Sequence, residues 1–368
     1  MLRTRRFVAS IPLAIGACAL SAFSLSSPIL GQQKRKVIID EDCAGPGGSN
    51  LQAVLALVNS PETDVLGIAV VTGDAWRDEE LAHTLRLLEI IGRTDIPVYP
   101  GAVFPLVNSR EEAAEWEKRY GNLVWQGAWK SDQTYHGPWE IPPMKEGAPA
   151  AKPAKEDAAH FLLRMVHQYP HEVTIYAGGP LTDLAVAQTI DPGFAALAKE
   201  LVIMGGSIHP VTKDPEFATR PQHEFNFWMD PEAARRVLRS PWTRLVVTTV
   251  DISLKTRMDK GLIAEIAKSK TPAAEYVVKY AQEGYMWDEI AAVAWLDPGV
   301  ITRTTRFYLD VSIDHAANYG DTLAWTAAQK PRIAGTLAEV QEDLDTDKFY
   351  KKFVKLMTRP TPGERPLN

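Results

Sequence analysis

Residues 37–58 read Val37-Ile-Ile-Asp40-Glu41-Asp42-Cys43-Ala44-Gly45-Pro46-Gly47-Gly48-Ser49-Asn50-Leu51-Gln-Ala-Val-Leu-Ala-Leu-Val58. The β-branched run at the start predicts a buried strand, and the apolar residues at helical spacing after residue 50 predict a helix that Ser49 or Asn50 caps. Three carboxylates therefore stand at the carboxyl end of a strand. Ligands of open α/β sheets bind beyond these strand ends, so this loop is the first candidate for a site.

The glycine-rich loop between this strand and helix allows more than one chemistry. A phosphate can bind where backbone N–H groups open a helix, but the preceding acidic residues would repel it, and the loop has neither the Lys-Ser/Thr of a P-loop nor G-x-G-x-x-G spacing. Carboxylate and amide oxygens suit a hard cation such as Ca²⁺ or Mg²⁺. The simpler alternative, in which Asp40 and Asp42 only cap the loop, stays open because Asp and Gly are ordinary turn residues.

The composition limits the class of protein. With 368 residues, 45% hydrophobic content and a net charge of −6, the chain can bury a large core and offers no basic surface for nucleic acid. The length suits one large α/β domain as well as two smaller ones. We predict a single α/β domain over residues 32–368.

The N-terminal residues have the pattern of a secretory signal peptide. Arg3, Arg5 and Arg6 precede the apolar run 7–20, and a Ser-rich stretch then leads to Gly31, which offers a cleavage point. We therefore expect residues 1–31 to be a signal peptide and the protein to be exported, to the periplasm or the medium, with no membrane partner afterwards. Cys18 lies in a loose lipoprotein cleavage box, and its lipidation would instead anchor the chain.

Removal of such a signal would leave Cys43 as the lone thiol. A nucleophile is one interpretation of a cysteine beside a candidate site. A small buried hydrophobic residue is the other, and is the more common use of a free cysteine.

Apolar strands and helical patterns alternate along most of the chain. Runs at 65–71, 96–99, 173–177, 201–204 and 245–250 each end near Gly, Pro or Asp and are followed by helical or irregular segments. This alternation predicts an α/β fold with a mostly parallel sheet and crossover helices on both faces. Residues 102–155 interrupt it with an aromatic-rich segment that has no clear periodicity, for which a lid over the pocket and simple burial are both open.

Several short motifs follow one another in a fixed order: Asn59-Ser-Pro-Glu62, Leu66-Gly-Ile-Ala-Val-Val-Thr-Gly-Asp74, Gly92-Arg-Thr-Asp-Ile-Pro-Val-Tyr-Pro-Gly101, Gly179-Pro-Leu-Thr-Asp-Leu-Ala185, Met204-Gly-Gly206, Glu224-Phe-Asn226 and Asp230-Pro-Glu-Ala-Ala234. This order resembles the inosine/uridine-preferring nucleoside hydrolases, and the resemblance covers nearly the whole chain after the signal. The family opens on Asp-x-Asp-x-Gly-x-Asp-Asp before an apolar helix. Asp40-Glu41-Asp42 matches the first half of that motif.

The resemblance implies a Ca²⁺ ion that binds the ribose hydroxyls and an attacking water. Asp42 matches the carboxylate that ligates the ion and acts as base, Asp288 matches a late ligand, and Gly178 falls where a backbone carbonyl binds. Glu224 and Asn226 match residues that contact the ribose.

Other positions depart from the family pattern. Ser49 and Asn50 align with the consecutive Asp pair, which assigns Ser49 to the substrate and Asn50, through its amide oxygen, to the ion. Asp74 stands where the family has a ribose-contacting Asn, and Trp287 where some members have a His near the leaving base. His136, in a His-Gly pair of the aromatic segment that resembles one in the family's active-site loop, is the candidate to replace that His as proton donor or base contact; the alternative is a solvent-exposed histidine in a turn.

The function implied is a hydrolase that cleaves the N-glycosidic bond of a ribonucleoside or related ribosyl compound with a metal-activated water. The alternative is a binding protein that kept the sugar pocket without turnover. Because position 50 lacks a carboxylate, we expect weak Ca²⁺ binding, with Asp40, on the same side as Asp42 by strand alternation, as a supporting or replacement ligand. Homologous folds often assemble as dimers or tetramers, so the resemblance leaves a homo-oligomer open, although no interface can be identified in the sequence.

Overall fold

A computed structural model describes residues 34–363, so the predicted signal peptide and Cys18 lie outside the described residues. A nine-stranded sheet runs through this part of the chain in the order β10-β9-β11-β6-β5-β4-β1-β2-β3. Its strands are β1 (Arg35–Glu41), β2 (Thr63–Val70), β3 (Val98–Pro100), β4 (Thr174–Ala177), β5 (Glu200–Met204), β6 (Leu245–Thr248), β9 (Ile301–Val311), β10 (Thr322–Thr326) and β11 (Ala338–Leu344). A separate pair is formed by β7 (Arg257–Met258) and β8 (Gly284–Tyr285).

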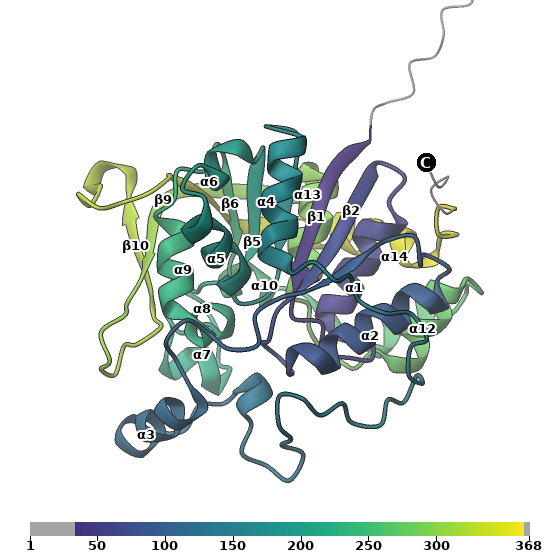
Figure 1. Cartoon of the computed structure of the whole chain (residues 1–368), viewed down its shortest axis with the longest axis horizontal. Helices are drawn as coiled ribbons and strands as arrows, with labels where there is room; N and C mark the ends of the chain where they lie inside the picture. The colour runs from purple at the N-terminus through teal and green to yellow at the C-terminus, as the bar shows by residue number, and fades with distance from the viewer. Residues whose placement is uncertain (1–33, 364–368) are drawn as a thin grey trace, which may run out of the picture. The chain divides into compact units, whose positions relative to one another are not determined.

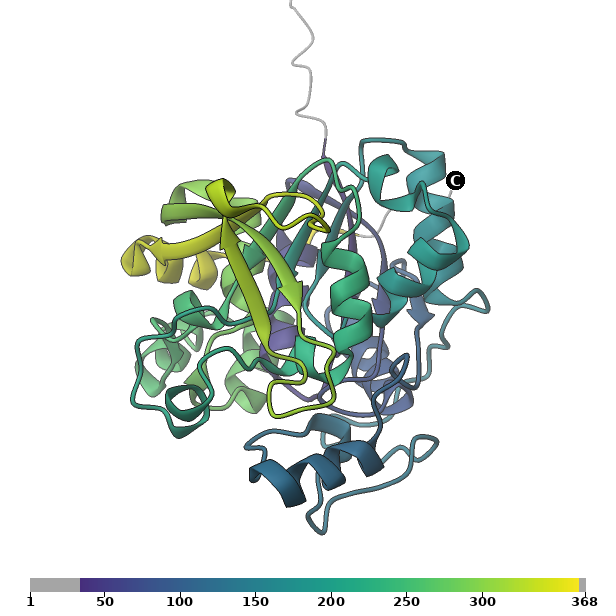
Figure 2. The same ribbon diagram turned by 90° about the vertical axis from the view of Figure 1, so that its left-hand side faces the viewer.

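The sheet is parallel from β3 to β11, and only β9 pairs antiparallel, with β10 and β11. Figures 1 and 2 show it at the centre, with β9 and β10 at one edge. The carboxyl ends of the parallel strands therefore meet on one side, which is where a crevice forms in open α/β sheets. The predicted fold class, a mostly parallel sheet with crossover helices, is confirmed.

Helices cover both faces of the sheet, and β1 shows why. Val37 and Ile39 pack into one apolar cluster, while Ile38 packs into another on the opposite face. The first cluster holds α1 (Ser49–Asn59), α13 (Asp288–Leu296) and α14 (Thr346–Thr358). The second holds α4 (Ala158–Gln168), α5 (Thr182–Ile190) and α9 (Pro231–Leu238). Both faces are buried, so the strands read as continuous apolar runs.

The other helices connect or flank these layers. They are α2 (Arg77–Ile90), α3 (Arg110–Tyr120), α6 (Phe194–Leu197), α7 (Pro215–Thr219), α8 (Phe225–Met229), α10 (Val250–Ser253), α11 (Lys260–Ile266) and α12 (Pro272–Tyr280), with 3₁₀ turns at Gly127–Trp129, Pro298–Val300 and Ala327–Gln329. Among the described residues, no helix is both long and apolar enough to cross a membrane.

Two local predictions were wrong. Residues 102–155 contain α3, whose first turn is capped by Ser109 accepting the N–H of Glu112, so Ser-x-x-Glu was a helix signal inside the segment that seemed irregular. Figures 1 and 2 both place α3 beyond the strand ends. The N-cap of α1 is Gly48, with no side-chain cap, because Ser49 and Asn50 bond residues elsewhere in the fold.

Candidate active site at the carboxyl ends of β1 and β4

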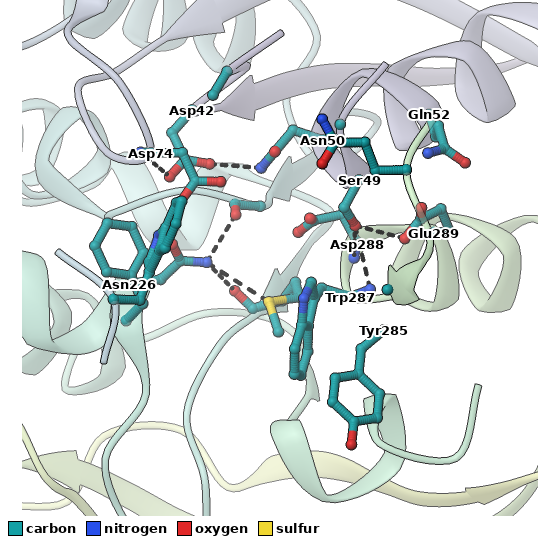
Figure 3. A pocket seen from close by; sticks show the side chains of 18 of the residues that line it. Asp42, Ser49, Asn50, Gln52, Asp74, Asn226, Tyr285, Trp287, Asp288 and Glu289 are labelled. Atoms are coloured by element: carbon teal, nitrogen blue, oxygen red, sulfur yellow. Dashed lines mark hydrogen bonds between the residues drawn. The ribbon is translucent and has the colours of Figure 1, made fainter. Parts of the chain in front are cut away.

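A cavity of about 590 Å³ opens where the parallel strands end. Asp42 follows β1, Asp74 follows β2, Gly178 follows β4, and the first residues of α1 and α13 close the cavity from the other side. Figure 3 shows Asp42 and Asp74 on one side, Ser49, Asp288 and Glu289 on the other, and Asn226 nearby. The structure thus brings together nearly all of the side chains that the sequence predicted for the site.

Asp42 is held in one orientation by two hydrogen bonds. Its Oδ2 accepts the N–H of Asp74 at 3.0 Å and its Oδ1 accepts Asn50 Nδ2 at 2.7 Å. Gly73 gives the carboxylate room, since a Cβ built on Gly73 would lie 2.6 Å from Asp42 Cβ. Burial, and then the charge of Asp74, raises the pKa of Asp42 well above its ordinary value.

Asp40 and Glu41 point to opposite faces of the sheet, and this corrects the prediction for Asp40. Asp40 follows the orientation of Ile38, and its pKa is raised by burial and by the charge of Asp183 in α5. Glu41 faces α1 and α13 instead, with Asn50 Nδ2 donating to its Oε2 at 3.2 Å. Asp42 lies past the strand end, so strand alternation does not govern its direction and Asp40 does not share its side.

Ser49 and Asn50 take roles that the sequence did not reveal. Ser49 Oγ accepts the N–H groups of Trp287 at 3.2 Å and Asp288 at 3.1 Å, and donates to Glu289 Oε2 at 2.6 Å. It therefore caps α13 rather than its own helix. Asn50 presents its amide nitrogen, not its oxygen, to Asp42 and Glu41.

Asp288 and Glu289 are buried at the start of α13. Burial, and then the neighbouring carboxylate of Glu289, raises the pKa of Asp288 well above its ordinary value, and Asp288 Oδ1 has no hydrogen-bond partner. Burial raises the pKa of Glu289 to about 8. Tyr176 fixes this helix to β4 by donating its hydroxyl to the carbonyl of Asp288 at 2.9 Å.

Glu224 and Asn226 form a fixed polar unit. Glu224 caps α8 by accepting the N–H groups of Asn226 and Phe227, and it also accepts that of Gly206. Asn226 donates its amide to the carbonyls of Gly178 at 2.8 Å and Met204 at 3.2 Å. The Gly178 carbonyl therefore faces the cavity with one hydrogen bond already made.

Aromatic rings line the rest of the cavity. Trp287 lies 5.2 Å from Tyr285 and 5.8 Å from Phe217, and Trp125 lies 6.5 Å from Phe225, all as distances between ring centroids. Trp125 Nε1 donates to Asp74 Oδ1 at 2.6 Å, while burial raises the pKa of Asp74 to about 6. Val124 and Trp125 bring the aromatic segment 116–139 to the cavity, but only through this short part of it.

His136 is the predicted site residue that the structure places elsewhere. It does not line the cavity; its Nε2 lies 2.9 Å from Glu79 Oε2 on α2, and its backbone carbonyl accepts Trp76 Nε1. This position does not support a role at the leaving base. Cys43 is fully buried in the core and burial raises the pKa of its thiol, as expected for an inert hydrophobic residue.

His136 belongs to a chain of acids and histidines that fastens the long segment to α2. Glu79 also lies 3.8 Å from His83 Nε2, and His83 Nδ1 contacts Glu146. A Cβ on Gly45 would lie 2.7 Å from the His83 ring, so this histidine also supports the loop after β1. Burial lowers the pKa of His83, but its bonds to Glu79 and Glu146 outweigh this and the net shift is upward, while the pKa of Glu79 is lowered by these histidines despite its burial.

We expect His83→Gln to lower the free energy of unfolding by about 1.5–3 kcal/mol at mildly acidic pH, the range for a hydrogen bond to a charged group. The stabilisation by His83 is complete below its unfolded pKa of 6.5 and is lost as the pH rises through its raised folded pKa. The stabilisation by Glu79 is complete above its unfolded pKa of 4.5 and is lost as the pH falls through its lowered folded pKa. Denaturation of both proteins across this range measures the difference. His160→Gln, at an exposed pair with Asp157, is the control; a constant difference at all pH values would contradict this assignment.

Ser49→Ala should lower the free energy of unfolding by about 1–2 kcal/mol, since it removes the cap of α13. It should also lower turnover, because Asp288 sits in the first turn of that helix. Chemical denaturation and a steady-state assay measure both effects. Ser109→Ala removes an equivalent cap from α3, and should cost similar stability without loss of turnover; equal turnover in both variants would show that the cap does not position Asp288.

The cavity floor has the chemistry of a cation site. Glu41 Oε1 and Asp288 Oδ1 are buried without partners, and the largest charge effects on Glu41, Asp42 and Asp288 come from other carboxylates. Such groups fit a hard cation, which prefers oxygen ligands. Within residues 34–363, however, no three His, Cys, Asp or Glu side chains already converge as a metal site; the Asn50 amide lies between two of the carboxylates.

The sequence missed several residues of this cavity: Trp125, Glu216, Phe217, Tyr285 and Glu289. It also missed Glu41, a fully buried acid that accepts a hydrogen bond from the cavity residue Asn50. Glu289 could have been found as the neighbour of Asp288, and Trp125 as part of the aromatic segment. Glu216 had no signal; burial, with Asp214 and Glu224 nearby, raises its pKa to about 7.

Comparisons with known proteins find similar sequences and similar folds. The family described as "Inosine-uridine preferring nucleoside hydrolase" matches residues 37–351. The chain is 29% identical over 276 residues to a probable uridine nucleosidase of Arabidopsis thaliana, covering 73% of this chain and 76% of that protein. It is 25% identical over 344 residues to an inosine-uridine preferring nucleoside hydrolase of Leishmania major, covering 88% and 98%. A plant nucleoside hydrolase structure superposes with a TM-score of 0.68 at 23% identity, covering 89% and 99%, which shows the shared fold.

Proposed function

The chain belongs to the inosine-uridine preferring nucleoside hydrolase family, and we propose that it cleaves the N-glycosidic bond of a ribonucleoside or related ribosyl compound with water. The observation that carries the proposal is the meeting of Asp42, Asp288 and Asn226 in one cavity at the strand ends, which aromatic rings also line. The polar side chains suit a ribose and a water, and the aromatic rings suit a flat base.

Asp42 is the proposed general base. Its two hydrogen bonds fix its carboxylate at the cavity surface, where it would take a proton from water as that water attacks the anomeric carbon. The neighbouring carboxylates favour the positive charge that develops on the sugar as the bond to the base breaks. Asn226, held by Glu224 and Gly178, is the proposed contact for ribose hydroxyls, together with Asp74. The Ser49 hydroxyl already makes three hydrogen bonds at the start of α13, so the substrate contact expected for it from the sequence is not part of the proposal.

Trp287 is the proposed stacking residue for the base; Trp125 and Phe225 also line the cavity. Trp287 has no acidic proton to give a leaving base, so stacking and exclusion of water are its contribution. This supports a substrate with a flat, poorly solvated leaving group rather than a named nucleoside.

A Ca²⁺ ion is proposed at Asp42, Asp288 and the Gly178 carbonyl, where it would lower the pKa of a bound water and hold ribose hydroxyls. The buried, unpartnered Asp288 Oδ1 supports this assignment. Asn50 contributes an oxygen only if its amide group turns, since its nitrogen faces the carboxylates. Weak binding is expected from that arrangement.

Export and homo-oligomer formation remain proposals that rest on the basic and apolar N-terminal pattern and on the fold class. Cell fractionation and light scattering of the purified protein test them.

The function is tested by incubating the purified protein with a panel of purine and pyrimidine ribonucleosides and measuring free ribose. Release of ribose from at least one member is expected, with matching deoxyribonucleosides as controls for the hydroxyl contacts. Binding of nucleosides without any ribose release would instead identify a binding protein on the same fold.

A further inference from the structure

Glu41 is a buried acid for which the mechanism above has no use. It is the last residue of β1 and faces the same side as Val37 and Ile39, toward α1 and α13. Its side chain is fully buried and yet keeps Oε1 without a hydrogen-bond partner. An ionisable group in this state needs compensation from somewhere, because burying an unpaired charge is unfavourable.

Glu41 does not itself line the cavity, but its neighbours Asp42, Asn50, Gly178 and Asp288 do. Asn50 Nδ2 bridges the two neighbouring carboxylates, at 3.2 Å from Glu41 Oε2 and 2.7 Å from Asp42 Oδ1. Gly178 leaves room for Glu41, since a Cβ there would lie 2.5 Å from Glu41 Cδ. Burial raises the pKa of Glu41 most, and the charge of Asp288 is the second cause. Glu41 thus lies among Asp42, Asp288 and Gly178, the groups assigned to the ion.

Position 50 explains why an acid at position 41 is useful. The family that this chain resembles has a carboxylate at the position of Asn50. The loop after β1 therefore carries one negative charge fewer beside the proposed Ca²⁺ ion. Glu41 occupies the variable position between Asp40 and Asp42 and brings one negative charge back to the same place. The bond from Asn50 to Glu41 makes the two positions direct neighbours.

We propose that Glu41 replaces the missing carboxylate of position 50, so that this chain holds its divalent cation with an exchanged Glu41/Asn50 pair. The inference rests on the proposed Ca²⁺ site. Without the cation, the Asn50 amide separates Glu41 from Asp42 and reduces their repulsion. With the cation, the carboxylate of Glu41 supplies the charge that attracts it.

The test is calorimetric titration of Ca²⁺ into the purified full chain and three variants. Glu41→Gln should weaken binding about 10- to 100-fold, the range for loss of a supporting metal-site group. Asn50→Asp should tighten it by adding a carboxylate. The double variant Glu41→Gln/Asn50→Asp has the native number of carboxylates in the opposite order, and should recover most of the affinity lost in Glu41→Gln.

Asp40→Asn is the matched control, since this acid is adjacent in sequence but faces α5, and it should leave Ca²⁺ affinity unchanged. Thermal melts with and without Ca²⁺ give a second readout: Glu41→Gln should lose the Ca²⁺-induced rise in Tm while keeping a Tm without Ca²⁺ no lower than native. Native affinity in Glu41→Gln, or no recovery in the double variant, overturns the inference. Absence of Ca²⁺ binding to the native protein would overturn it as well. Ribose release by the chelator-treated protein then tests the proposed function on its own, because hydrolysis without Ca²⁺ would keep that function while the inference fails.

Discussion

Asp42→Asn is expected to lower the turnover number for ribose release about 10²- to 10⁴-fold, the range for loss of a general base. Asparagine has nearly the same shape and can keep one of the two hydrogen bonds that orient Asp42, from Asp74 N–H to Oδ2. It cannot take a proton from water. A steady-state assay with the preferred nucleoside measures the effect, and ligand binding measured separately shows whether the cavity still holds the substrate.

The stability of the same variant provides an internal check. The pKa of Asp42 is higher in the folded protein than in the unfolded chain. The protonated carboxyl therefore stabilises the folded state below the unfolded pKa, and this stabilisation is lost as the pH rises through the folded pKa. At neutral pH without Ca²⁺, Asp42→Asn should therefore raise Tm. Asp40→Asn changes a neighbouring buried acid outside the cavity and should keep near-native turnover. Comparable losses in both variants would mean that the assay detects general damage to β1 rather than loss of a base.

The sheet could be predicted because its signals are local and repeated. Ile38, Ile39 and Val70 lie in apolar runs between polar turns, and such runs become parallel strands when both faces of a sheet are covered. Helix α3 was missed because aromatic residues hid an ordinary capping signal at Ser109. Strand β9 pairs antiparallel with the edge strand β10 and with β11, and local patterns do not encode which strands become neighbours.

The predicted site residues came from motif positions, and position alone did not determine what each side chain does. Ser49 was expected to cap α1 or meet the substrate, but its hydroxyl reaches α13, more than 200 residues later in the chain. Asp40 was assigned to the side of Asp42 by strand alternation, which fails once the strand has ended. The same use of strand alternation placed Glu41 on the side away from Asp42, so Glu41 was overlooked. Only the tertiary fold shows which of three consecutive acids faces the cavity floor.

Gly73→Ala is expected to lower turnover about 100-fold, because the loss of alignment by a fraction of a bond length is enough to misplace a reacting group. The new methyl group would overlap the Asp42 carboxylate and lie 2.6 Å from Asp42 Cβ, so the base must move and give up the 3.0 Å bond from Asp74. Overpacking of this kind should also lower the free energy of unfolding by about 1–3 kcal/mol. Kinetics and chemical denaturation measure the two effects.

The matched control for Gly73→Ala is Gly284→Ala. Gly284 also lines the cavity, but a Cβ there has no atom within 4 Å, so both turnover and stability should stay near native. The comparison isolates the orientation of Asp42 from the mere addition of a methyl group to the cavity wall. If Gly73→Ala keeps native turnover while its stability falls, the carboxylate can move without penalty, and the fixed geometry of Asp42 is not what makes it a base. A selective loss of turnover would show that the glycine after β2 is present to leave space for the base beyond β1.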